Sequence, residues 1–365
     1  GAGIMAAQYW GKRDAASIEK VIPIALRTNL LFSGLFTILA GFYPEMLMRI
    51  FTNDAALVAS GSQYLRAVAL SYVLCGISQV YLILLKNTGH AAVSSRISST
   101  AVVLNIILNA ILIYGLCGAP ALGIRGAAYA TVAARVVELI WAYLETKKPE
   151  RVRILWNRLF SSAGKILSED FWRYTLPVLA ASLVWGIAYV LYSVIMGHMG
   201  SDAVAANSIT SIAKSLLSCL IRGVSGGAGV LIGNLLGANE LEKAREYGGR
   251  LSHLSIAIGI VTGGLLMLIS PAIVHFAPLS DTAAEYLQYM LLFCGLNLMA
   301  QSVNTTVLDG IFCAGGDAKF DMQGNIGAMW CFSVPLGFLA AFWLKLPVMV
   351  VYLSLIHISE PTRPY

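Results

Sequence analysis

Nine long apolar stretches limit how this chain can fold. Each has about 20 or more residues with few charges, the length that an α-helix needs to cross the hydrocarbon core of a bilayer. A backbone inside the bilayer must satisfy its own polar groups, so these stretches predict helices. Only 12% of the residues are charged, against about 25% in soluble domains, which excludes a soluble fold. The sequence therefore predicts an all-α polytopic membrane protein, with spans at approximately 21–42, 61–85, 97–117, 123–144, 174–197, 203–233, 251–275, 284–313 and 321–343.

Basic residues fall in alternate connections between the predicted spans. One set of connections contains only Arg49, Arg125 and Lys345. By the positive-inside rule, the other set is cytoplasmic. We interpret the net charge of +6 as a signal of orientation and predict no nucleic-acid partner. The expected location is the cell membrane, as a multi-pass protein of a prokaryotic inner membrane. The cytoplasmic set comprises Lys12, Arg13, Lys20, Lys86, Arg96, the segment 145–173, Lys243, Arg245, Arg250 and Lys319.

The segment 145–173 is the one long polar stretch of the chain. It has seven basic residues and four acidic ones, and its apolar residues recur at roughly helical spacing. This pattern predicts a basic amphipathic helix on the inner membrane surface. We therefore predict an N-terminal lobe at 1–145, a cytoplasmic amphipathic linker at 146–172 and a C-terminal lobe at 173–353. The apolar residues are Ile154, Leu155, Trp156, Leu159 and Phe160.

The two halves of the chain repeat one another. Gly89, His90 and Ala91 precede Gly316, Asp317 and Ala318 by 227 positions, and four residues near the start precede four later ones by 226. Several matches in one order indicate duplication. We predict two homologous six-helix lobes, twelve helices when intact and about nine complete here. The four pairs are Gly3 with Gly229, Gln8 with Asn234, Gly11 with Gly237, and Asp14 with Glu240.

The same repeat predicts incomplete ends. About 50 residues of the first lobe would lie upstream, enough for one helix and most of a second. Residues 1–10 are expected to end a helix and residues 347–353 to begin one. The run from Ser354 breaks the apolar pattern and resembles a translated sequencing adapter, so we expect residues 354–365 to be non-native.

Four stretches together resemble the multidrug and toxic compound extrusion (MATE) family. The resemblance implies a twelve-helix exporter with two lobes around a central cavity. Such proteins move amphipathic, often cationic drugs or metabolites outward by alternating access, in exchange for Na⁺ or H⁺. It also implies a small-molecule substrate, no cofactor beyond the transported ion and a monomer in the lipid bilayer. The stretches are AAQYWGKRDAASIEKV, NIILNAILIYG followed by GIRGAAYATVAARVVE, LPVLAASLVWGIAYVLYSVIMGHMGSDAVAANSI and LIGNLLGANELEKA.

Asn105 and Asn109 are candidates for cation coupling. They lie four positions apart on one predicted helix and so share a face. Their amide oxygens can face Na⁺ or a protonated carboxylate. Some family members have Asn and Asp at this spacing, so here a titrating carboxylate must come from elsewhere, usually the first helix. Ordinary hydrogen bonding between helices is the alternative.

Lys214 and Asp309 are the charged candidates of the second lobe. A lone charge in apolar sequence costs about 3 kcal/mol on insertion scales, and pairing with each other would reduce that cost. The pair could exchange partners with a cation or substrate, form a structural ion pair, or leave Asp309 to reach the membrane surface. The family's carboxylate after Pro177 is absent, with Ser182 and Trp185 in that region. We therefore expect coupling to reside in the first lobe.

Trp185, Tyr189 and Tyr192 follow a helical spacing of four and three. They could line a cavity suited to organic cations, or they could serve only in packing. Arg135 and Glu138 are three apart and are predicted to pair locally near the cytoplasmic end of their helix.

Two other functions compete with antiport. Flipping of lipid-linked oligosaccharides, the work of relatives in the same superfamily, would favour a strongly cationic cavity, which only Lys214 and Arg222 support. An intramembrane enzyme is the weaker alternative, because no His pair or Ser, His and Asp set clusters in the sequence. The six cysteines lie apart, with no pair at metal spacing. We expect neither an enzyme nor a metal site.

Overall fold

The computed structural model describes residues 1–50, 54–149, 151–154, 156–160 and 164–356. Within these residues every regular element is a helix. Nine helical segments are long and apolar enough to cross a bilayer, and each overlaps one of the nine predicted stretches. The prediction of an all-α polytopic membrane protein is confirmed.

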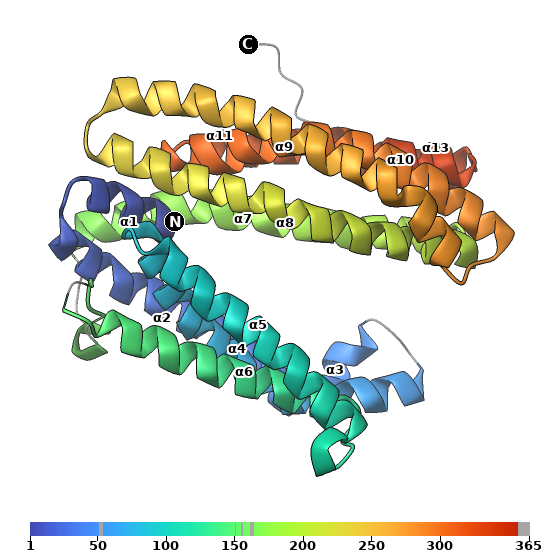
Figure 1. Ribbon diagram of the computed structural model, residues 1–365, viewed down its shortest axis with the longest axis horizontal. Helices are drawn as coiled ribbons and strands as arrows, with labels where there is room; N and C mark the ends of the chain where they lie inside the picture. The colour runs from blue at the N-terminus through green and yellow to red at the C-terminus, as the bar shows by residue number, and fades with distance from the viewer. Residues whose placement is uncertain (51–53, 150, 155, 161–163, 357–365) are drawn as a thin grey trace. The chain divides into compact units, whose positions relative to one another are not determined.

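The chain divides into two compact units. The first is Ala2–Phe171, and the second is Trp172–Tyr365 together with Gly1. Figure 1 labels most of the helices of both. The first unit contains α1 (Ala2–Gly11), α2 (Ala15–Phe42), α3 (Pro44–Arg49), α4 (Ala55–Asn87), α5 (Ala91–Tyr114), the short turn η1 (Leu116–Gly118), α6 (Ile124–Thr146) and the short turn η2 (Trp156–Arg158).

The second unit contains most of α7 (Lys165–His198). This helix begins within the last residues of the first unit. Three elements of the second unit are π-helical segments, which widen the helix locally. The elements are α8 (Ser201–Gly237), α9 (Leu241–Phe276), α10 (Asp281–Asn304), the π segment η3 (Thr305–Phe312), α11 (Ala318–Ile326), the π segment η4 (Gly327–Ser333), α12 (Val334–Phe338), the π segment η5 (Leu339–Trp343) and α13 (Val348–Ile356).

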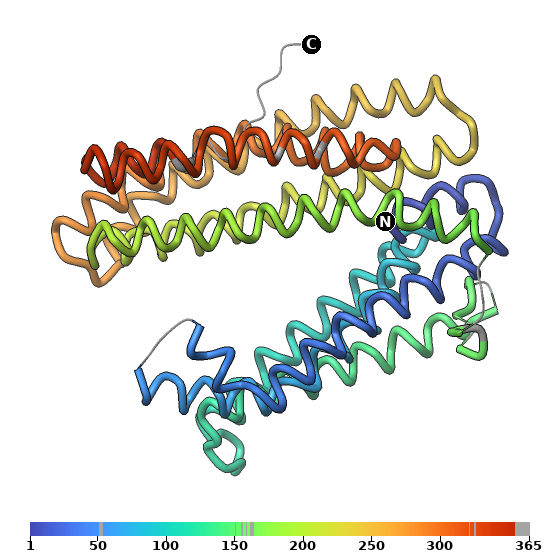
Figure 2. Tube along the Cα trace, turned by 180° about the vertical axis from the view of Figure 1, so that it is seen from behind, coloured from blue at the N-terminus to red at the C-terminus, as the bar shows by residue number. Residues whose placement is uncertain are grey.

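Within the first unit, α4 packs against both α2 and α6, and α5 packs against α6. These helices run alongside one another in Figure 2. Ile18, Leu26 and Leu84 are buried where α2 meets α4. At Gly126 on α6, a Cβ atom would collide with the backbone carbonyl of Leu112 on α5. Small residues allow such close approach between membrane helices.

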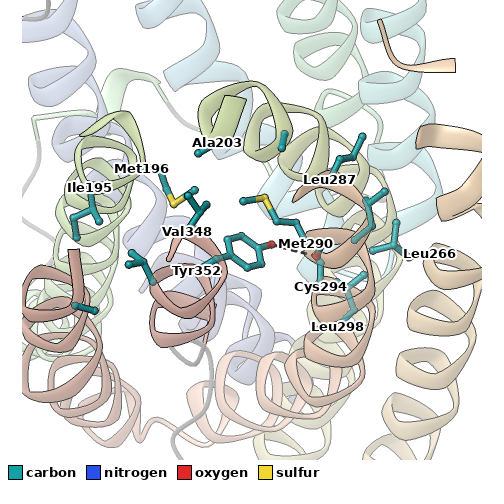
Figure 3. Packing of buried hydrophobic residues seen from close by; sticks show 14 of the residues in the cluster. Ile195, Met196, Ala203, Leu266, Leu287, Met290, Cys294, Leu298, Val348 and Tyr352 are labelled. Atoms are coloured by element: carbon teal, nitrogen blue, oxygen red, sulfur yellow. Dashed lines mark hydrogen bonds between the residues drawn. The ribbon is translucent and has the colours of Figure 1, made fainter. Parts of the chain in front are cut away.

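Within the second unit, α10 packs against α8 and α9. Its core contains Leu266, Leu287, Cys294 and Leu298, all fully buried (Figure 3). At Gly263 on α9, a Cβ atom would collide with the backbone carbonyl of Gly295 on α10. Each unit therefore brings at least one pair of helices into backbone contact through a glycine.

The backbone confirms the predicted repeat. Arg13 and Asn239, which lie 226 positions apart, both adopt the left-handed conformation, with φ of 59° and 61°. The N–H of Asp14 donates to the Tyr9 carbonyl, and the N–H of Glu240 donates to the Leu235 carbonyl, again at the same offset. Helices also begin at matching positions: α2 with α9, α4 with α10, and α5 with α11. Because rare backbone conformations coincide, the two halves share one structural plan.

The predicted amphipathic helix in the linker is wrong for the residues that the structure describes. Residues 156–158 form only the 3₁₀ turn η2, and α7 begins at Lys165, before the predicted lobe boundary at 173. Val152 is buried, and Ile154 and Leu159 pack against the core of the first unit. These three side chains thus contact protein, whereas Phe160 is exposed. Leu155 lies outside the described residues.

The predicted partial helices at the two ends are helical, as α1 and α13. Helix α13 continues through Ile356, past the predicted boundary at Leu353. Residues 357–365 of the predicted non-native tail lie outside the described residues.

Candidate functional site

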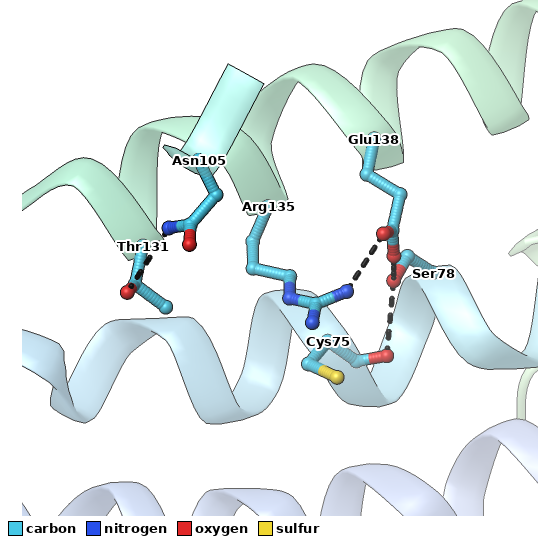
Figure 4. A network of polar contacts seen from close by, with 6 residues as sticks. All are labelled: Cys75, Ser78, Asn105, Thr131, Arg135 and Glu138. Atoms are coloured by element: carbon cyan, nitrogen blue, oxygen red, sulfur yellow. Dashed lines mark hydrogen bonds and ion pairs between the residues drawn. The ribbon is translucent and has the colours of Figure 1, made fainter. Parts of the chain in front are cut away.

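The polar site of the first unit lies between α5 and α6. The Asn109 Nδ2 donates to Asn105 Oδ1 at 3.1 Å. The Asn105 Nδ2 donates to Thr131 Oγ1 at 3.3 Å (Figure 4). Thr131 Oγ1 in turn donates to the Ala127 carbonyl at 3.0 Å. One turn of α5 is therefore linked through two amides to a hydroxyl on α6.

One atom in this chain of contacts has no partner. The Asn109 Oδ1 is buried and accepts no hydrogen bond from the described residues. A buried carbonyl oxygen without a donor destabilises the fold, because it has lost its hydrogen bonds to water and has no hydrogen bond within the protein. The arrangement can therefore offer this oxygen to a bound cation.

Thr131 belongs to the site, although sequence reasoning missed it. It is 26 positions from Asn105, and threonine is common in membrane helices as a hydrogen-bonding residue. Only the packing of α5 on α6 brings the two together.

The predicted pair of Arg135 and Glu138 is confirmed, but it is not merely local. Arg135 Nη1 lies 2.7 Å from Glu138 Oε2. Ser78 on α4 donates its hydroxyl to the other oxygen, Glu138 Oε1, and also to the Cys75 carbonyl. Only 1% of the Glu138 side chain is exposed, against 31% for Arg135. Figure 4 shows this carboxylate joining α6 to α4, a role that the spacing of three did not predict.

In the second unit, Lys214 lies in the middle of α8 and is only partly exposed. Its Nζ donates to Asn297 Oδ1 on α10 at 3.3 Å. Asp309 lies in the π segment η3 and is exposed. Across the described residues, Lys214 has no ion pair with Asp309, so the structure does not bring these two candidates together. No pattern in the sequence indicated Asn297 as a partner of Lys214.

The aromatic candidates form a continuous stack along α7. The Trp185 and Tyr189 rings are stacked at 5.6 Å, and the Tyr189 and Tyr192 rings at 6.3 Å. Trp185 and Tyr189 are about half exposed. Tyr192 is partly buried against the core of the second unit, and its hydroxyl donates to Asn207 Oδ1 on α8 at 2.6 Å. Whether the stack lines a substrate cavity stays a prediction.

A cavity of about 450 Å³ opens in the first unit beside the beginning of α7. None of the predicted site residues lines it. Its lining residues are Ile24, Arg27, Phe160, Gly164, Lys165, Ser168 and Glu169.

Comparison with known proteins identifies a family to which this chain is similar. A family model described as MatE matches residues 1–111 and 177–339, well over half of the chain. The chain is 20% identical over 356 residues to the uncharacterized transporter YisQ of Bacillus subtilis, covering 98% of this chain and 78% of the relative. It is 23% identical over 340 residues to the probable multidrug resistance protein NorM of Thermotoga maritima, covering 91% and 72%.

A solved structure has the same fold. It is the outward-facing conformation of a multidrug resistance MATE family transporter, with a TM-score of 0.86 at 19% identity. The match covers 98% of this chain and 79% of that one. At this identity the likeness establishes the fold alone.

Proposed function

Because the chain belongs to the MatE family of multidrug efflux transporters, we propose that it exports amphipathic small molecules in exchange for a cation. Membership makes the chain a multi-pass transporter of the cell membrane that acts on small molecules, and not an enzyme. The names of the relatives, multidrug resistance proteins among them, favour drug export over the flipping of lipid-linked oligosaccharides. Cation coupling, alternating access and action as a monomer are proposals.

The unpartnered Asn109 Oδ1 carries the coupling proposal. Hard cations such as Na⁺ are bound by carbonyl, hydroxyl and carboxylate oxygens. Asn109 is tied through its Nδ2 to Asn105, and Asn105 is tied to Thr131 on α6, so the proposed cation would bind at the end of a contact chain that contains further amide and hydroxyl oxygens. Binding would give Asn109 Oδ1 the partner that it lacks among the described residues.

The same contacts favour Na⁺ over a proton. The hydrogen-bond partners of Asn105 and Asn109 are neutral amide and hydroxyl groups, which do not titrate at physiological pH. Glu138, one of the two carboxylates on α6, already accepts from Arg135 and Ser78. A proton there would have to displace an ion pair, whereas a sodium ion at Asn109 displaces nothing.

The test is efflux of rhodamine 6G, a fluorescent cation, from vesicles containing the chain. Sodium and proton gradients are imposed separately. We expect a sodium gradient to accelerate efflux and Asn109→Ala to abolish the acceleration while the variant still inserts normally. Efflux that responds to neither gradient would refute antiport.

Asn234→Ala provides the matched control. Its Oδ1 is also buried without a partner among the described residues, but it lies on α8 in the second unit and is not part of the contact chain of Asn105 and Thr131. We expect sodium-driven efflux to survive in Asn234→Ala. Equal loss in both variants would mean that the defect comes from removing a buried amide and not from the site on α5.

A further inference from the structure

Lys214 is a membrane-embedded cation whose partner in the protein is neutral. It lies in the middle of α8, and its Nζ donates to the Asn297 amide oxygen. Throughout the described residues no carboxylate forms an ion pair with it. An amide oxygen accepts one hydrogen bond but does not cancel a positive charge, and charged groups in a bilayer are normally paired.

A second cation lies on the same face of α8. Asn207, Lys214, Ser218 and Arg222 are spaced by seven, four and four residues, which places them along one side of the helix. Arg222 is exposed and has no ion pair within the described residues. This side of α8 therefore carries two basic residues, with the buried Ser218 between them.

The aromatic stack on α7 reaches the same side of α8. Tyr192 ends the stack that begins at Trp185, and its hydroxyl donates to Asn207. Asn207 lies two helical turns from Lys214. A flat apolar surface and an uncompensated positive charge are thus joined within one unit.

We infer that this surface binds the anionic group of a flat, amphipathic organic molecule at Lys214, with the apolar body against Trp185 and Tyr189. The inference rests on the proposed transport function and names a substrate class for it. A carboxylate or sulfonate would supply the negative charge that the protein does not, as a charge-assisted hydrogen bond to the ammonium. Aromatic faces suit the planar remainder.

Two dyes with the same ring system provide the test. Fluorescein is an anion at pH 8 and rhodamine 6G is a cation, and both are built on xanthene. Binding of each to the purified full chain in neutral detergent is followed by fluorescence anisotropy. We expect Lys214→Met to weaken fluorescein binding about tenfold or more, Lys214→Arg to stay within about threefold, and rhodamine 6G binding not to weaken in either.

Lys165→Met is the matched control. Lys165 is exposed on α7 and lies 3.9 Å from Glu169, so its loss removes one positive charge far from Lys214 along the chain. Fluorescein affinity should not change. Failure of the wild-type chain to bind fluorescein, or equal affinity in the wild type and Lys214→Met, overturns the inference.

A replacement variant and a lipid competitor complete the experiment. If Lys214→Met does not elute as a folded protein, Lys214→Gln replaces it and must show the same loss. An anionic lipid headgroup has the same chemistry, so phosphatidylglycerol is added as a competitor. Displacement of fluorescein by this lipid at equimolar amounts would assign the surface to lipid and overturn the inference. Because binding is measured without gradients, it can succeed where gradient-driven rhodamine efflux fails, or the reverse.

Discussion

The two units treat their membrane-embedded cations in opposite ways. In the first unit, Arg135 lies 2.7 Å from the buried carboxylate of Glu138, which also accepts from Ser78. In the second, Lys214 contacts only a neutral amide oxygen of Asn297 among the described residues. The two units nevertheless share helix starts and rare backbone conformations. Duplication preserved the framework, while the charges inside it diverged.

This difference separates a structural charge from one available to a ligand. A cation that is paired with a carboxylate of the protein binds an anionic substrate only weakly, because its charge is already compensated. A cation with a neutral partner keeps an uncompensated charge, which an anionic substrate can pair with. Arg135 is therefore the counter-ion of the carboxylate that joins α6 to α4, whereas Lys214 keeps a charge that the proposed anionic ligand would pair with.

The largest expected effect is on stability, and its sign should differ between the units. Glu138→Gln leaves Arg135 without its counter-ion, and breaking a buried pair costs about 3–5 kcal/mol, here toward the lower end because Arg135 is partly exposed. Lys214→Met removes an uncompensated cation and should leave stability equal or higher. Thermal unfolding of both variants in detergent measures the contrast.

A double variant sharpens this result. Replacing Arg135 and Glu138 together, by Met and Gln, removes both charges, so it should restore much of the stability lost in Glu138→Gln. If Glu138→Gln and Lys214→Met destabilise equally, the division into a structural and a binding cation is wrong.

The sequence predicted the framework because that part depends on local pattern. Apolar length defined nine spans, and the motif around Gly11 and Gly237 revealed the repeat that the φ values of Arg13 and Asn239 confirm. Contacts between distant residues were not accessible. The bond from Ser78 to Glu138 joins residues 60 positions apart, and that from Lys214 to Asn297 joins residues 83 apart. Neither spacing nor hydropathy indicates such a pair.

The linker shows how a correct pattern can lead to a wrong element. Apolar residues recur through 154–160 at helical spacing, yet Ile154 and Leu159 pack on the core of the first unit around the short turn η2, and Phe160 is exposed. Periodicity reports that one side is buried, but not what covers it. The preference for a membrane surface was an inference from composition, and the protein core provides the same apolar environment.

The two units differ in their charges, and the glycine contacts test whether their helices nevertheless pack in the same way. Gly126→Ala would push a methyl group into the Leu112 carbonyl, and Gly263→Ala into that of Gly295. We expect each to lose about 1–3 kcal/mol from overpacking. Gly264→Ala is the control, because nothing lies within 4 Å of a Cβ there. Thermal unfolding should show similar losses in both units, and loss in only one would limit the likeness to the backbone path.

A smaller effect is expected where the linker meets the first unit. Trp156 donates its indole N–H to the Tyr81 hydroxyl at 2.8 Å, and Tyr81 is 1% exposed. Trp156→Phe keeps an aromatic ring but removes the donor, at a cost of about 1 kcal/mol. Tyr81→Phe removes the other partner and should cost a similar amount. The double variant should lose less than the sum, and full additivity in unfolding measurements would show that the bond contributes nothing.

The smallest expected effect concerns the matched helix starts of α2 and α9. Asp14 caps α2 by accepting from the Ser17 N–H at 3.0 Å, whereas Glu240 makes no side-chain cap for α9. The Ser17 hydroxyl and N–H also hold the pKa of Asp14 below its ordinary value. The stabilisation is therefore complete above the unfolded carboxyl's value near pH 4 and disappears as the pH falls through the lower folded value. Asp14→Ala should lower stability by about 0.5–1 kcal/mol at pH 7, and Glu240→Ala should have no capping effect. Unfolding of both variants at pH 7 distinguishes them, and equal losses would show that the two helix starts differ in sequence but not in energy.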